Sequence, residues 1–269
     1  MSVCTEIQIR VKVNDISINY EVTGNGKTLV LIHGVGGNAQ AWETTVPLLS
    51  RYHRVLTWDV RGHGQSDKPE GSYSTELFAS DLAALLRTVD IGSAFVLGHS
   101  MGGVIAIRFA LDFPDLCNTL IVSSSSAEVN SQSTKYWQGM ATNVLEKGIE
   151  AIPFDPTRTF SKSFVERNPE VVEELARNRL ANDPSCYARA AIAMSEYNYN
   201  EELGRIRCPT LIIVGDQDVM TPPGGSVRMS RLIPNSKLII FKDCGHVSYV
   251  EQPEVFSRAV LDFLTEVNT

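Results

Sequence analysis

The sequence of 269 residues has few cysteines, and none of them lie close together. Zinc sites and small disulfide-bonded domains need regularly spaced cysteines, so an odd number without a C-x-x-C pair argues against both. We therefore expect reduced thiols, as in a cytosolic protein. The five cysteines are Cys4, Cys117, Cys186, Cys208 and Cys244.

Long apolar runs are also absent. No stretch approaches the ~20 apolar residues that a membrane-spanning helix needs. The first residues do not form the basic and then apolar segments of a secretion signal. These absences predict a cytoplasmic protein without a membrane anchor.

Positive charge is scarce. The chain has 24 Lys and Arg residues against 31 Asp and Glu residues, a formal net charge of −7. A nucleic-acid surface or a lipid-headgroup site would need a concentration of basic side chains. We therefore expect neither nucleic acid nor a membrane as a partner, and the oligomeric state stays open.

Two patterns of apolar residues predict the strands. Apolar and polar residues alternate over 7–13 and over 16–22 around Asn14-Asp15, which predicts a β-hairpin. Short, nearly continuous apolar runs are typical of strands covered on both faces, as in a parallel sheet. Six such runs follow, over 28–32, 55–58, 94–97, 120–122, 210–214 and 238–241.

Helical periodicity falls between these runs. It covers 39–49, 77–89, 104–111 and 255–264. Alternating strands and helices predict an α/β fold with a mostly parallel, eight-stranded sheet flanked by helices, of which the hairpin is the antiparallel part.

One stretch breaks the alternation. Residues 127–203 contain no buried strand pattern but have helical stretches, such as 169–181 and 185–197, separated by prolines. We interpret this stretch as a helical lid inserted into a core formed by 1–126 and 204–269. Its many aromatic residues include Trp137 and Tyr197.

A candidate nucleophile lies in Gly98-His99-Ser100-Met101-Gly102, which matches G-x-S-x-G. A predicted strand runs directly into the motif and a helix follows it. This sharp strand-to-helix turn projects a serine Oγ, and small residues relieve crowding around the strained backbone. The context favours Ser100 as a nucleophile over an ordinary glycine-rich loop.

A serine hydroxyl needs a base, and the base needs an orienting acid. His246 follows the last predicted strand and is last in the chain order Ser, acid, His. Asp216 and Asp218 both follow the strand over 210–214, and we choose Asp218 because it lies further beyond the strand end. Glu128 is a weaker substitute.

Two backbone amides are candidates to stabilise an oxyanion. The Met101 amide follows the nucleophile at the start of a helix. The second is the Val35 amide in His33-Gly-Val-Gly-Gly37, where glycines let the backbone turn inward.

With these residues in place, the chain resembles the α/β-hydrolase superfamily over nearly its whole length. The resemblance implies that Ser100, Asp218 and His246 are a catalytic triad, and that 61–66 is a structural loop. The matching segments are His33-Gly34, Asp59–Ser66, Gly98–Gly103, Gly215–Asp218 and Gly245-His246.

Within the superfamily, the segment 244–253 is similar to the ending of 3-oxoadipate enol-lactonases. The Ser-Met-Gly-Gly motif also resembles theirs, and that of acyl-homoserine lactonases and cofactor-free haloperoxidases. Ser100 stands where epoxide hydrolases and haloalkane dehalogenases carry aspartate, and His99 where carbon–carbon hydrolases typically carry asparagine.

The sequence thus predicts a serine hydrolase that cleaves carboxylic esters or lactones through an acyl-enzyme on Ser100. No metal or organic cofactor is expected. Trp137 and Tyr197 are candidates to contact the substrate, although packing between lid and core would also explain them.

Three alternatives remain. A protein of this fold can act as a slow or non-catalytic ligand sensor, since fold does not determine function. Acyl transfer to an alcohol or amine would use the same site. A dinucleotide-binding enzyme is the third, because Gly34, Gly36 and Ala39 fit G-x-G-x-x-A and Asp59 follows 20 residues later.

Overall fold

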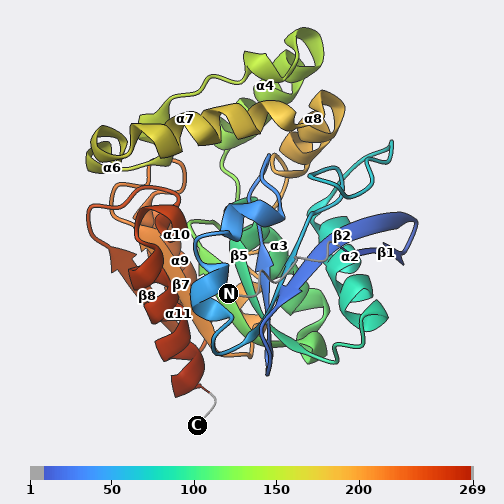
Figure 1. Ribbon diagram of the computed structural model, residues 1–269, viewed down its shortest axis with the longest axis vertical. Coiled ribbons are helices and arrows are strands. Elements are labelled where there is room, and N and C mark those ends of the chain that lie inside the picture. Colours follow the sequence, from blue (N-terminus) through green and yellow to red (C-terminus); the bar gives the residue numbers. More distant parts are fainter. Residues whose placement is uncertain (1–8, 268–269) are drawn as a thin grey trace, which may run out of the picture.

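A single eight-stranded sheet forms the centre of the molecule (Figure 1). The computed structural model describes residues 9–267. The strand order is β1-β2-β4-β3-β5-β6-β7-β8, which confirms the predicted α/β-hydrolase architecture. The strands are β1 (Ile9–Val13), β2 (Ile16–Thr23), β3 (Thr28–Ile32), β4 (Arg54–Trp58), β5 (Ala94–His99), β6 (Cys117–Ser123), β7 (Thr210–Gly215) and β8 (Ser236–Phe241).

The first two strands form the predicted antiparallel hairpin. Val13 pairs with Ile16 around the turn, where Asn14 has a φ of 49°, a left-handed conformation that asparagine tolerates. β2 is antiparallel to β4, and every later pairing is parallel. Residues 7 and 8, which the sequence pattern also assigned to the first strand, lie outside the described residues.

Apolar cores lie on both faces of the sheet. In β3, Leu29 and Leu31 pack into one cluster, while Val30 and Ile32 pack into the other. A continuous apolar strand serves both clusters because successive side chains point to opposite faces. α2 (Thr75–Thr88), α3 (Met101–Asp112) and α9 (Pro223–Leu232) contribute to the second cluster, and α11 (Pro253–Glu266) contributes to the first.

The continuous helix expected over 39–49 is wrong. The chain forms a 3-10 helix (η1, Ala39–Trp42) and then a single helical turn (α1, Val46–Leu49). Pro47 has no N–H group, so it cannot make the hydrogen bond that would join the two pieces. Periodicity alone did not show this interruption.

The predicted insertion, residues 127–203, is helical and lies above the sheet in Figure 1. Glu128 and Asn198 form a lone bridge at its two ends. α4 packs on α8, and together they form a small apolar cluster of their own. Its α-helices are α4 (Ser131–Lys147), α5 (Pro156–Thr159), α6 (Lys162–Arg167), α7 (Pro169–Asn178) and α8 (Pro184–Ala193).

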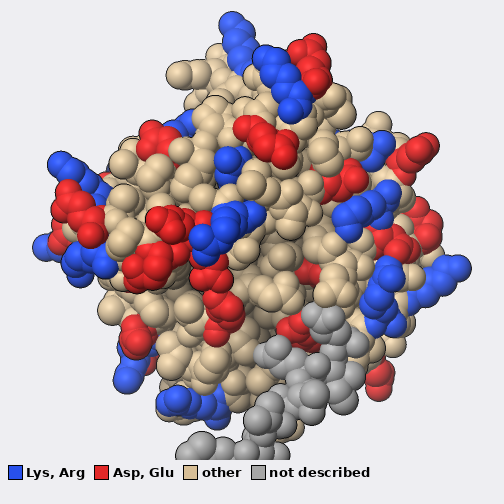
Figure 2. Space-filling model, turned by 45° about the horizontal axis from the view of Figure 1, so that its top comes forward, with Lys and Arg blue, Asp and Glu red and all other residues tan. Residues whose placement is uncertain are grey.

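The surface carries charges of both signs. Figure 2 shows Lys and Arg side chains interspersed with Asp and Glu on the face seen there, without a large region of one sign. Among residues 9–267, no helix is both long enough and apolar enough to cross a membrane.

Candidate active site

Ser100 occupies the turn between β5 and α3. Its φ is 54° and its ψ is −119°, a strained conformation for a residue with a side chain. The turn can form because its neighbours are small. A Cβ on Gly98 would lie 2.0 Å from the Gly102 carbonyl oxygen, and a Cβ on Gly102 would lie 2.2 Å from the Ile32 carbonyl oxygen.

The serine run after β6 supports this turn. The Ser100 N–H donates to the Ser123 carbonyl oxygen over 3.0 Å, and Ser125 Oγ donates to the Ser100 carbonyl oxygen over 2.8 Å. A Cβ on Gly103 would lie 2.5 Å from the Ser125 Cβ. The sequence marked this run only as a brief serine-rich stretch, and its supporting contacts come from strand pairing across the sheet.

His246 and Asp218 form a hydrogen-bonded pair. His246 Nδ1 lies 2.9 Å from Asp218 Oδ2, and the pair is almost wholly buried. The amides of Met220 and Thr221 donate to Asp218 Oδ1, and Thr221 Oγ1 donates to Oδ2 over 2.7 Å. Thr221 is a member of this cluster that the sequence did not suggest.

The ionised form of Asp218 is favoured. Burial alone would raise its pKa, but the charge of His246 and the hydrogen bonds from His246 and Thr221 outweigh burial and lower the pKa to about 2. The carboxylate therefore stays negative at neutral pH, as required of a group that orients a histidine and stabilises its protonated form.

The other two candidate acids have other hydrogen-bond partners. Asp216 is exposed, and its Oδ1 accepts the Cys244 N–H over 3.3 Å, so it stabilises the turn that carries His246. Glu128 is ion-paired with Arg228. Of the three candidate acids, the structure thus pairs Asp218 with the histidine.

His99 packs against the His246 ring. The centroids of the two histidine rings are 4.8 Å apart. The Tyr249 ring contacts His99 in a T-shaped arrangement, with the centroids 4.9 Å apart. Burial, together with the nearby charge of His246, holds the pKa of His99 well below its usual value. His99 therefore supports the ring of His246 as a neutral, packed side chain.

His33 fixes the loop that contains Val35. Its Nε2 accepts the Val60 N–H over 3.0 Å, which leaves Nδ1 to donate to the Gly34 carbonyl oxygen over 2.7 Å. This pairing needs the neutral ring, and burial lowers the pKa of His33 accordingly. The loop lies against the nucleophile, since a Cβ on Gly34 would lie 3.3 Å from the Ser100 Cβ.

The amides of Val35 and Met101 are the two candidate donors to an oxyanion. Among the described residues, neither N–H donates a hydrogen bond to a protein acceptor. Met101 is the first residue of α3, where an amide has no partner within the helix. The two amides belong to the start of α3 and to the loop after β3, and both segments lie against Ser100.

Ser100 and His246 line one small cavity of about 70 Å³. No hydrogen bond joins the two side chains among the described residues, and in enzymes without substrate such contacts are often longer than in the working complex. Trp137 and Tyr197, the two candidates for contact with a substrate, line the same cavity. The remaining lining residues are Met101, Val104, Ser125, Ser126, Glu128, Val129, Ser133, Met194, Met220 and Thr221.

Glu251 joins the histidine loop to the insertion. Its Oε1 accepts the Gly245 N–H over 2.8 Å, while its Oε2 accepts from the N–H and the Oγ of Ser161, over 3.0 and 2.6 Å. The His246 N–H also donates to the Thr159 carbonyl oxygen. Glu251 is distant from the other site residues in the sequence except His246, so its role was visible only in three dimensions.

Asp59 is committed to internal hydrogen bonds, which contradicts the dinucleotide hypothesis. Its carboxylate is fully buried and accepts from the amides of Ala39 and Gln65 and from Asn19 Nδ2. It is therefore not available to a ribose. The segment at Ala39 opens only a four-residue 3-10 helix.

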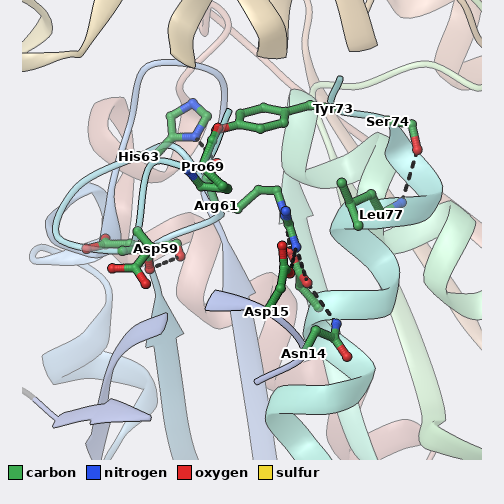
Figure 3. A network of polar contacts seen from close by, with 12 residues as sticks. Asn14, Asp15, Asp59, Arg61, His63, Pro69, Tyr73, Ser74 and Leu77 are labelled. Atoms are coloured by element: carbon green, nitrogen blue, oxygen red, sulfur yellow. Dashed lines mark hydrogen bonds and ion pairs between the residues drawn. The ribbon is translucent and has the colours of Figure 1, made fainter. Parts of the chain in front are cut away.

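The same loop carries a second buried ion pair (Figure 3). Arg61 donates to Asp81 through Nε over 2.5 Å and through Nη2 over 2.8 Å, and Nη2 also donates to Asp15. Asn14 donates to Asp81 as well. This network ties the hairpin turn to α2.

Comparison with known proteins agrees with the geometry. A family model described as the alpha/beta hydrolase fold matches residues 27–253. The chain belongs to this family. It is 32% identical over 249 residues to 3-oxoadipate enol-lactonase 2 of Acinetobacter baylyi, covering 91% of this chain and 92% of that protein.

Two further α/β-hydrolases show the range of relatives. A 2-hydroxy-6-oxononadienedioate/2-hydroxy-6-oxononatrienedioate hydrolase of Burkholderia vietnamiensis is 32% identical, with 93% and 91% of the two chains covered. The structure of a thermophilic esterase from Thermogutta terrifontis is similar with a TM-score of 0.91 at 29% identity, covering 98% of this chain and 100% of the other. These relatives act on different substrates, and the enzyme class that they support is a hydrolase.

Proposed function

We propose that this α/β-hydrolase cleaves carboxylic esters or lactones through an acyl-enzyme on Ser100. The observation that carries the proposal is the buried Asp218–His246 pair, which opens onto the same cavity as a serine held at a strained strand-to-helix turn. This arrangement supplies nucleophile, base and orienting acid at one place.

The first half of the reaction forms the acyl-enzyme. Ser100 Oγ attacks the carbonyl carbon while His246 takes the hydroxyl proton, and the carbonyl π electrons move onto its oxygen. The amides of Val35 and Met101 stabilise this oxyanion, and such a donor is typically worth about 3 kcal/mol in the barrier. When the intermediate collapses, the bond to the alkoxy oxygen breaks and His246 protonates the leaving alcohol.

The second half releases the acid. A water molecule gives a proton to His246 and attacks the acyl carbon, and the acyl–serine bond then breaks as Ser100 Oγ takes the proton back. In a lactone, the alcohol and the acid stay in one molecule. Trp137 and Tyr197 contact the acyl or ring portion from the insertion side of the cavity.

The comparisons support an ester or lactone as the substrate. The names of an enol-lactonase and an esterase among the relatives fit the same acyl-transfer chemistry. A ligand sensor with this site would bind such compounds and turn them over slowly, so turnover rate separates the two hypotheses.

The test is hydrolysis of a substrate panel by the wild type, Ser100→Ala and the matched control Ser131→Ala, which alters an exposed serine of α4. The panel contains p-nitrophenyl acetate, butyrate and octanoate, an enol-lactone and an acyl-homoserine lactone. We expect Ser100→Ala to lose at least about 10⁴-fold in kcat and Ser131→Ala to match the wild type. Activity that survives in Ser100→Ala would overturn the proposed mechanism, and tight binding without turnover would favour the sensor.

A further inference from the structure

The cavity at Ser100 has an acidic wall. Glu128 lines it, between the end of β6 and the start of α4. Apart from His246, the other lining side chains are uncharged, and no Lys or Arg belongs to the lining in the described part of the chain. A substrate carboxylate in this cavity would therefore meet hydroxyl groups, the His246 imidazole and a carboxylate, but no Lys or Arg side chain of the described residues.

Glu128 is held in place from outside the cavity. Arg228 of α9 donates from Nη1 to Glu128 Oε1 over 2.5 Å. Arg228 is exposed and is not part of the lining. The Glu128 backbone is fixed as well. Its carbonyl oxygen accepts a hydrogen bond from Ser126 Oγ, and Glu128 forms an isolated β-bridge with Asn198. The acidic side chain thus stays at the cavity wall.

The cavity is also small. A ligand site for a drug-sized molecule usually encloses roughly 300–1,000 Å³, whereas this cavity encloses about 70 Å³. Its apolar side chains, among them Met101, Val104 and Trp137, suit a short hydrocarbon group. The serine and tyrosine hydroxyls of the lining are uncharged, and those of Ser125 and Ser126 already donate to backbone carbonyl oxygens.

From the acidic wall, the lack of Lys and Arg in the described lining and the size of the cavity, we propose that Glu128 is a specificity-determining residue that selects short, uncharged acyl groups and rejects acyl groups that end in a carboxylate. This inference rests on the proposed function. It predicts that lactones or half-esters of dicarboxylic acids, which keep one free carboxylate, are poor substrates. Arg228 partly neutralises Glu128 and so moderates the rejection.

A matched substrate pair tests the proposal. The ethyl half-ester of succinic acid and ethyl 4-methylpentanoate have acyl groups with equal numbers of heavy atoms, and they end in a carboxylate and an isopropyl group. For the wild type, we expect kcat/KM to favour the uncharged ester by at least about tenfold, the effect of a like charge a few ångströms away in a partly shielded site. The reaction is followed at constant pH by titration of the released acid.

Three variants locate the cause. Glu128→Gln should reduce the preference at least about fivefold by removing the like charge. Arg228→Ala should increase it, because the Glu128 charge is then unopposed. Glu146→Gln, which removes an exposed acid of α4 outside the lining, should leave it unchanged. A preference that Glu128→Gln and Arg228→Ala leave as in the wild type would overturn the proposal.

Binding separates this inference from the proposed function. In Ser100→Ala, calorimetry with the two esters measures the same selectivity without turnover. A wild type that hydrolyses neither ester would contradict the proposed function, whereas Ser100→Ala binding both esters equally would contradict the role of Glu128. Stronger binding of the uncharged ester supports that role whether or not turnover is seen.

Discussion

Two buried carboxylates of this protein, Asp81 and Asp218, have similar burial but different surroundings, one in a network between the hairpin and α2 and the other in the candidate active site. Both side chains have 0% exposure, and each is paired with a basic side chain that is itself at most 5% exposed. Arg61 keeps its charge at every accessible pH, and the two hydrogen bonds to Asp81 raise its pKa further despite its burial. His246 carries an imidazole, the side chain that most often acts as a general base in enzymes, and lies at the wall of a cavity.

The difference shows that burial and pairing alone do not define a catalytic site. The Asp81 network joins the hairpin turn to α2 and to the loop after β4. Its hydrogen bonds run between protein side chains. In the Asp218 pair, the histidine lines the cavity that Ser100 also lines. We therefore expect catalysis to require a partner side chain that can act as a base and a cavity beside it, and removing one carboxylate at a time tests this expectation.

The largest effect on activity is expected for Asp218→Asn. The amide keeps the size of the side chain but removes the charge and disfavours the tautomer in which His246 Nδ1 carries the proton, so kcat should fall by about 10⁴-fold. Steady-state kinetics on the best ester of the panel measures this loss. Asp216→Asn, on the same turn, serves as the control and should retain activity within a few-fold, and an equal loss in both variants would contradict the assignment of Asp218.

The opposite profile is expected for Asp81→Asn. Breaking a buried ion pair from one side typically costs about 3–5 kcal/mol in the free energy of unfolding, because the remaining charge stays buried. Urea denaturation measures this cost, and kcat of the folded protein should stay within a few-fold of the wild type. The double variant Arg61→Met/Asp81→Leu should lose less stability than Asp81→Asn. A large loss of kcat in the folded single variant would break the contrast between the two pairs.

A smaller effect is expected for Glu251, which acts on His246 through the backbone. Glu251→Ala removes the acceptor of three hydrogen bonds, so we expect kcat to fall by about tenfold with little change in KM, the result of a slightly misplaced base. Glu251→Gln should recover part of the loss because its amide oxygen still accepts. Glu254→Gln, an exposed acid on α11, is the matched control. A change confined to KM would assign Glu251 to the substrate pocket instead.

The sequence predicted what local patterns encode. Continuous apolar runs identified the strands because burial on both faces leaves no polar positions, and the strand-to-helix context of Ser100 and the chain order of Asp218 and His246 singled these residues out. The helix over 39–49 was wrong because its periodicity is interrupted by Pro47, a single missing N–H.

Other parts of the site depend on contacts between distant segments. Ser125 supports Ser100 from a neighbouring strand, and Glu251 meets Ser161 across 90 residues. Cys117 and Cys208, which the spacing kept apart, have their Sγ atoms 4.0 Å from each other as free thiols. Such contacts arise from the order of strands in the sheet and from the path of the insertion, which a single sequence does not display.

The contacts of Glu251 also bear on how this scaffold can be altered. Exchanging the insertion for that of another α/β-hydrolase is an obvious route to new substrates, but Thr159 and Ser161 belong to the exchanged segment and hold the backbone at Gly245 and His246. A chimaera that omits them would acquire a new pocket and lose the anchor of its base. Grafts that preserve residues 159–161, or transfer them together with Glu251, would change the substrate pocket and still keep the hydrogen bonds that hold the His246 loop.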